Sequence, residues 1–176
     1  MLRKFALATT AILALTVTDT RTVTPAKASP QIFENLSGKW RGRGTVKAGP
    51  KAKAENIRCR MTAKPKGDSR VNTSGNCAVG GFVFSLGGFI EQKGSVYTAS
   101  MFRSLANIKQ NNFSGKRSGT KINFSFNARD RLSKQNISAR ILLNSKNNKS
   151  FDVQITRTDP KSGKLFKVGT IKFTQR

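Results

Sequence analysis

The sequence of 176 residues has no histidine and only 8 acidic residues, against 33 lysines and arginines. Histidine is the usual side chain for acid–base catalysis at neutral pH, so its absence removes the commonest general base. No two acidic residues have a spacing that forces a paired acid and base, and the G-x-S-x-G motif of many serine hydrolases is missing. The sequence therefore predicts a protein that is not an enzyme, with no catalytic residue and no cofactor.

Long apolar segments are also scarce. The apolar run at residues 5–17 is shorter than the roughly 20 residues that a membrane-spanning helix needs, so no membrane span is expected. The run follows Arg3 and Lys4 and leads to a small-x-small site that ends at Ala28, before Ser29. This pattern is typical of a secretory signal peptide, cleaved here between Ala28 and Ser29. It favours a periplasmic location; the alternative interpretation is an N-terminal amphipathic helix.

Cysteine is limited to Cys59 and Cys77. An even number of cysteines in an exported chain indicates one disulfide. Two thiolates in a chain without histidine cannot complete a tetrahedral zinc site from soft ligands. We therefore expect a Cys59–Cys77 disulfide and no bound metal.

Apolar and polar residues alternate from Trp40 onward, and glycine, asparagine, serine and proline interrupt the pattern at short intervals. Such alternation is typical of half-buried β-strands. It predicts an all-β fold, a single antiparallel meander closed into a small barrel of about 8–10 strands, with a β-sandwich as the alternative. The strands are expected near 38–47, 56–63, 71–77, 82–90, 96–102, Phe113, 121–126, 137–143, 151–156 and 165–173.

Several details of this pattern are less regular. We expect bulges or bends at Gly87–Gly88 and at Gly169, and a turn over 114–119. The segment 103–112 reads as a long loop or one helical turn. The chain then divides into a signal peptide (1–28), an N-terminal tail (29–35) and one β-barrel domain (36–176).

The stretch IFENLSGKWRGRGTV, which ends at Val46, resembles the entry to a calycin barrel of the lipocalin and avidin type. The resemblance covers Phe33, Leu36, Gly38 and Trp40, and it implies that the tryptophan closes the barrel floor. In that superfamily an arginine from a late strand often covers the indole ring, and Arg157 has the matching inward parity. The middle motif of the lipocalins is not recognisable. The W-x-G-x-G pattern and the cysteine pair also resemble exported alphaproteobacterial proteins, a similarity that implies no activity.

Positive charge is the strongest compositional signal. The expected leader holds four basic residues and one acidic residue, so the exported chain would keep a formal charge of +22. Such a field attracts anions, which in an envelope compartment are lipopolysaccharide phosphates, lipid headgroups and acidic polysaccharide. A general lysine bias is the alternative explanation. The candidate anion-binding residues are Arg41, Arg43, Lys47, Lys51, Lys53, Lys116, Arg117 and Lys121.

Three classes of function fit these observations. The barrel could hold a small apolar or amphiphilic ligand in a mouth lined by Phe82, Phe84, Phe124 and Phe126. It could instead bind an anionic polymer or lipid headgroups through its outer face. The layout also resembles periplasmic inhibitors of serralysin-type metalloproteases, with residues 29–34 as the inhibitory tail. Nucleic acid is disfavoured by the expected leader and by the few outward aromatics. The sequence does not indicate whether the protein is a monomer or an oligomer.

Overall fold

The computed structural model describes residues 31–100, 112–129 and 136–176. The expected leader, its cleavage site at Ala28–Ser29 and the segment 103–111 lie outside the described residues. Within the described ranges the chain forms one short helix and ten strands: α1 (Gln31–Leu36), β1 (Gly38–Val46), β2 (Glu55–Pro65), β3 (Arg70–Val79), β4 (Phe82–Lys93), β5 (Val96–Ser100), β6 (Asn112–Ser118), β7 (Lys121–Arg129), β8 (Asn136–Ser145), β9 (Ser150–Thr158) and β10 (Leu165–Gln175).

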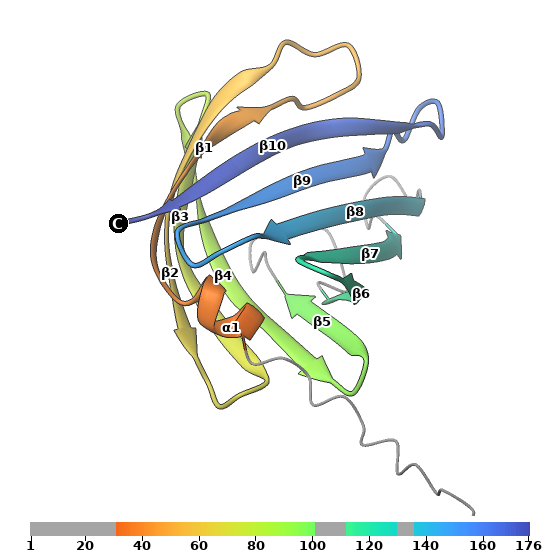
Figure 1. Ribbon diagram of the computed structural model, residues 1–176. Helices are drawn as coiled ribbons and strands as arrows, with labels where there is room; N and C mark the ends of the chain where they lie inside the picture. The colour runs from red at the N-terminus through yellow and green to blue at the C-terminus, as the bar shows by residue number, and fades with distance from the viewer. Residues whose placement is uncertain (1–30, 101–111, 130–135) are drawn as a thin grey trace, which may run out of the picture.

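The strands form one closed antiparallel barrel. Each strand pairs with the next along the chain, and β1 pairs with β10 to close the sheet (Figure 1). Closure removes the unpaired edges that would otherwise invite aggregation. The expected all-β meander is therefore confirmed, and the sandwich alternative is excluded because a single sheet closes on itself.

The two ends of the barrel differ. The end that holds α1 and the β2–β3, β4–β5, β6–β7 and β8–β9 turns is here called the helix end. The β1–β2, β3–β4 and β9–β10 hairpins lie at the opposite end, here called the far end (Figure 1). Every strand runs between these two ends, so the position of a residue in its strand fixes its height in the barrel.

The helix α1 packs into its end of the barrel. Ile32, Phe33 and Leu36 are buried, and the Phe33 ring lies 6.1 Å from the Tyr97 ring between centroids. We expected residues 29–35 to form a tail, so this is a correction for the described part of that segment. The apolar triplet at Ile32, Phe33 and Leu36 has helical spacing, and burying it against the barrel stabilises the helix.

The disulfide forms as expected between β2 and β3. Cys59 and Cys77 face each other directly in the antiparallel register, with Cα atoms 4.0 Å apart. Both side chains point inward and are buried.

Three irregularities were predicted with mixed success. The register shifts between Lys167 and Gly169, which confirms the bulge near Gly169. The β3–β4 register runs without a shift through Gly87 and Gly88, so no bulge occurs there. The expected turn over 114–119 is wrong as well, because β6 continues to Ser118. Its Gly115 lies opposite Phe124, whose ring occupies the space of an inward side chain.

Candidate functional site

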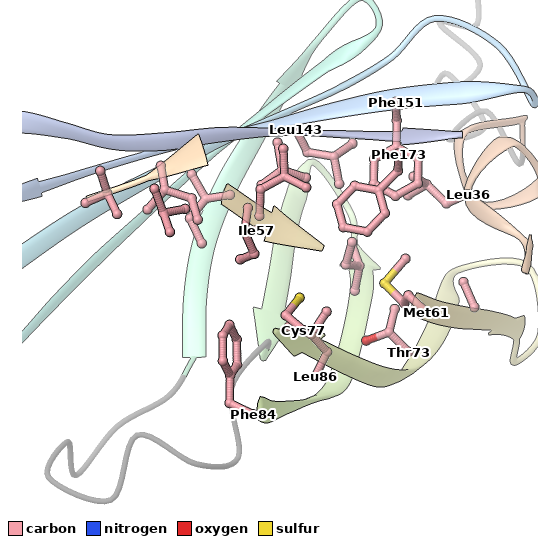
Figure 2. Close-up of a pocket in the computed structure, with 18 of the residues that line it drawn as sticks. Leu36, Ile57, Met61, Thr73, Cys77, Phe84, Leu86, Leu143, Phe151 and Phe173 are labelled. Carbon is pink, nitrogen blue, oxygen red and sulfur yellow. The ribbon is translucent and has the colours of Figure 1, made fainter. Parts of the chain in front are cut away.

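The barrel encloses an apolar cavity of about 250 Å³ (Figure 2). Among the described residues that line it, Thr73 is the one with a polar side-chain group, apart from the disulfide-bonded Cys77. The lining residues come from α1, β1–β4 and β8–β10: Leu36, Val46, Ile57, Met61, Ala63, Val71, Thr73, Cys77, Val79, Phe84, Leu86, Ile90, Ile141, Leu143, Phe151, Val153, Ile155, Val168, Ile171 and Phe173.

The cavity runs along the barrel axis. Leu36 and Phe173 bound it near the helix end, whereas Val46 and Val79, the last residues of β1 and β3, line it near the far end. In Figure 2, Phe84 and Leu86 lie across the cavity from Leu143, Phe151 and Phe173. Because the lining is almost wholly apolar, the cavity suits hydrocarbon or aromatic groups and offers little to a polar one.

Only one of the four candidate lining phenylalanines contributes to the cavity. Phe84 lines it, but Phe82 is 78% exposed at the start of β4. Phe124 and Phe126 are buried, yet neither lines the cavity; the Phe126 ring packs on Phe113 at 4.9 Å. The described parts of β5–β7 fill their side of the barrel, so the free space lies beside the other strands.

Trp40 lies fully buried next to α1. Its indole Nε1 donates a hydrogen bond to the Leu36 carbonyl oxygen at 2.9 Å, and its ring meets Phe151 edge-on at 4.8 Å. The hydrogen bond satisfies a carbonyl in the last turn of the helix. Trp40 therefore joins the helix to the first strand at the helix end of the barrel.

Arg157 does not cover the Trp40 ring, so that expectation is wrong. Phe151, near the start of β9, contacts Trp40, and six residues further along the strand Arg157 lies about 20 Å away. At the far end its guanidinium Nη2 donates to the Ala48 carbonyl oxygen at 2.6 Å and lies 5.3 Å from the centroid of the Phe166 ring. Arg157 lies on the same face of β9 as Phe151, but the distance along the strand separates it from Trp40.

The Phe166 ring carries a second cation. Lys47 Nζ lies 5.9 Å from its centroid and donates a hydrogen bond to the Pro50 carbonyl oxygen. Arg157 is half-buried, and its Nε is shielded from solvent without a hydrogen-bond partner among the described residues. The far end thus holds two cations beside the inner face of the barrel.

The candidate anion-binding residues do not form one site. Arg41 and Arg43 lie on the outer wall of β1, and Lys47, Lys51 and Lys53 belong to the β1–β2 hairpin at the far end. Lys116, Arg117 and Lys121 lie on the β6–β7 hairpin at the helix end, where Arg117 Nε donates to the Gly119 carbonyl oxygen. Sequence reasoning did not place Arg58 and Arg60 beside the β1 arginines. Their R-x-R alternation was visible, but only the strand register brings the two pairs together.

One carboxyl group in the β9–β10 turn has a perturbed pKa. A hydrogen bond from the Ser162 hydroxyl, with the backbone amides of Lys161 and Ser162, holds the pKa of Asp159 below its usual value. This residue orders an exposed turn. Among the described residues, no group of three or more cysteine and acidic side chains is placed to hold a metal. No helix in the part of the chain that the structure describes is long and apolar enough to cross a membrane.

Comparison with known proteins shows the fold. No protein-family model and no curated protein matches the sequence. Among solved structures, Rv2717c from M. tuberculosis matches with a TM-score of 0.59 and 11% identity, over 81% of this chain and 93% of that chain. The two share a barrel fold. A de novo designed fluorescence-activating β-barrel matches with a TM-score of 0.46 and 13% identity, over 83% and 98% of the two chains. The redesigned barrel mFAP1, bound to DFHBI, has a TM-score of 0.45 and 12% identity, over 83% and 99%.

Proposed function

We propose that this protein is an exported, non-catalytic, calycin-like binding protein of the cell envelope whose barrel holds a small amphiphilic ligand. The apolar cavity of about 250 Å³ carries the proposal. An apolar group that fills this space would be removed from water and would stabilise the folded protein by an amount that rises with its buried area and its concentration.

The far end supports a ligand with an anionic head. Ile155 and Val168 line the cavity, and Arg157 follows Ile155 on the same face of β9. Arg157 Nε and Lys47 Nζ would lie close to the head of a molecule whose tail extends towards the helix end. A guanidinium binds a carboxylate or phosphate through two parallel hydrogen bonds, which gives the site a preference for such a head.

Native mass spectrometry of the protein purified from its own cells tests for a retained ligand. We expect a mass above that of the chain that starts at Ser29, and the excess mass is expected to disappear after extraction with organic solvent. Dodecanoate should then bind to the extracted protein, as measured by calorimetry. A protein that is recovered without a ligand and that fails to bind dodecanoate would overturn the proposal.

A matched pair of variants locates the site. Leu86→Trp places a large ring in the cavity, whereas Leu165→Trp adds the same ring at a residue that is 51% exposed outside it. We expect dodecanoate to bind at least tenfold more weakly to L86W and within twofold of the unsubstituted affinity to L165W. Equal losses in both variants would place the ligand elsewhere.

The head group is tested at Arg157. Arg157→Gln should weaken dodecanoate binding about fivefold to tenfold, because a charge-assisted hydrogen bond is lost, and should leave neutral dodecanol binding unchanged. Lys161→Gln, an exposed cation on the neighbouring turn, serves as the control. If R157Q weakens both ligands equally, its effect is on the structure of the far end and the anionic head is refuted.

The protease-inhibitor alternative loses its structural basis. Its inhibitory segment was expected at residues 29–34, but residues 31–34 belong to α1, where Ile32 and Phe33 are buried. A segment held in this way is not available as an extended tail. Binding of anions at the outer face has a specific observation in its favour, which is the arginine cluster described below.

A further inference from the structure

Four arginines lie side by side on the outer wall of the barrel. In the β1–β2 register Arg41 is opposite Arg60 and Arg43 is opposite Arg58. All four side chains are exposed, and together they border one shallow surface depression. We call these four residues the arginine wall.

No acidic residue is a cross-strand neighbour of the arginine wall. Its neighbours on β10 are Thr174 and Lys172, and its neighbours on β3 are Asn76 and Ala78. Like charges directly opposite each other on a sheet are destabilising, so this arrangement costs folding free energy. The ion pairs among the described residues both involve Glu91, remote from the wall, with Arg70 and Lys93 as partners.

The arginine wall contains arginine and no lysine. The chain has 19 lysines and 14 arginines, yet all four wall positions are arginine. A general excess of lysine therefore does not account for the cluster. Guanidinium groups bind phosphate through paired hydrogen bonds that an ammonium group cannot reproduce, which makes phosphate-bearing surfaces the chemistry that fits best.

An apolar hairpin tip adjoins the arginine wall at the far end. Phe82 is 78% exposed and Val83 is 71% exposed at the start of β4. Val83 borders the same depression as the arginines, and the outward row Arg43, Arg58, Ala78, Val83 crosses four neighbouring strands. Neighbouring large side chains this exposed are unusual in a protein that meets only water, and they are typical of a contact surface.

We propose that the arginine wall and the Phe82–Val83 tip dock this protein on a membrane surface rich in anionic phospholipid. The arginines bind the headgroup phosphates while the two apolar side chains enter the interfacial layer. Lys47, Lys51 and Lys53 lie on the β1–β2 hairpin at the same end and add to the attraction. This inference goes beyond the proposed ligand and stands without it, since neither the arginine wall nor the Phe82–Val83 tip lines the cavity.

Docking in this orientation turns the far end towards the lipid. The cavity is lined by Val46 and Val79 near that end, so its far end lies towards the lipid in this orientation. A soluble polyanion such as nucleic acid would also bind the arginine wall, but its binding would not account for the exposed apolar side chains of Phe82 and Val83. The outward rows around the wall, moreover, carry no aromatic side chain on which bases could stack.

Vesicle co-sedimentation tests the docking surface. We expect the protein to bind vesicles of phosphatidylglycerol and phosphatidylcholine, and to bind pure phosphatidylcholine vesicles at least tenfold more weakly. Each arginine near an anionic surface contributes on the order of a fivefold gain in affinity, so Arg58→Gln/Arg60→Gln should bind roughly 10–30-fold more weakly. Phe82→Ser/Val83→Ser should lose about tenfold, and this loss should persist at about 0.5 M salt, where charge effects are screened.

Two control variants separate docking from general charge. Lys116→Gln/Arg140→Gln removes the same charge from exposed positions on the opposite wall, and Val96→Ser removes an exposed apolar side chain at the helix end. Both should bind within twofold of the unsubstituted protein. Equal weakening by R58Q/R60Q and K116Q/R140Q would mean diffuse attraction only and would overturn the proposal. The proposal would also be overturned if the protein bound a single-stranded oligonucleotide more tightly than vesicles and F82S/V83S did not weaken its binding to vesicles.

Discussion

At the scale of single residues, two positions in the first strand illustrate how a short motif acts on the whole barrel. Trp40 donates to the Leu36 carbonyl and packs on Phe151, so it joins the helix, β1 and β9. Gly44 permits a close approach of β10, because a Cβ atom there would meet the Thr170 carbonyl oxygen and lie 2.9 Å from the Ile171 Cα. Trp40 adds contacts to the core, whereas Gly44 leaves the space that the β10 backbone occupies.

Gly44→Ala should therefore destabilise the protein by about 1–3 kcal/mol, because the backbone of β10 must move to accept the methyl group. Gly87→Ala is the matched control, since a Cβ at Gly87 would have no neighbour within 4 Å and the φ angle needs no glycine. Urea unfolding followed by Trp40 fluorescence measures both. A G44A midpoint equal to that of G87A would show that the close approach is not restrictive.

At the scale of elements, the pairing of β2 with β3 brings the two cysteines together. Cys59 and Cys77 are directly opposite in the register, and the disulfide closes a loop with a sequence separation of 18. The same hairpin supplies one half of the arginine wall, through Arg58 and Arg60. The disulfide therefore crosslinks a hairpin whose outer arginines, Arg58 and Arg60, are repelled by the arginines opposite them on β1.

Reducing this disulfide should lower the free energy of unfolding by about 3 kcal/mol, because the unfolded chain gains the freedom of the opened loop. Urea unfolding with and without a thiol reductant measures the change. Cys59→Ala/Cys77→Ala is the control and should show no response to the reductant. If the reductant shifts the variant and the unsubstituted protein alike, the change does not come from this bond.

At the scale of the whole molecule, charge repulsion opposes folding. The formal net charge of the chain is +25, and the ion pairs among the described residues are confined to Glu91. Salt screens repulsion between exposed cations at distances beyond about 8–10 Å. Screening this repulsion should raise the free energy of unfolding. The ion pairs in the described part of the chain are too few for the screening of their attraction to cancel that increase.

Raising sodium chloride from about 0.02 M to about 0.3 M should therefore raise the thermal midpoint, since repulsion is screened more than attraction. The unfolding temperature can be followed by circular dichroism. R58Q/R60Q should show a smaller response to salt, because it lacks two opposed like-charge pairs. A midpoint that falls with salt would contradict the dominance of repulsion.

Much of the barrel was predictable because strand alternation is a local property. The period of two placed Trp40 and the cysteines inward and the β1 arginines outward, and an even cysteine count indicated the disulfide. The site was less predictable. Phe82, Phe124 and Arg157 have inward parity, yet one extends beyond the far end, one fills the core and one lies far from Trp40.

The amino-acid sequence by itself determined the strands, their inward and outward faces and the excess of positive charge, since each depends on neighbouring residues along the chain. Only the tertiary structure decided where the cavity lies and which arginines share a surface. Those features depend on strand register and on height in the barrel, which are set by how ten strands close around one core. Arg43 and Arg58, 15 positions apart in the chain, become neighbours through the register of the β1–β2 pair.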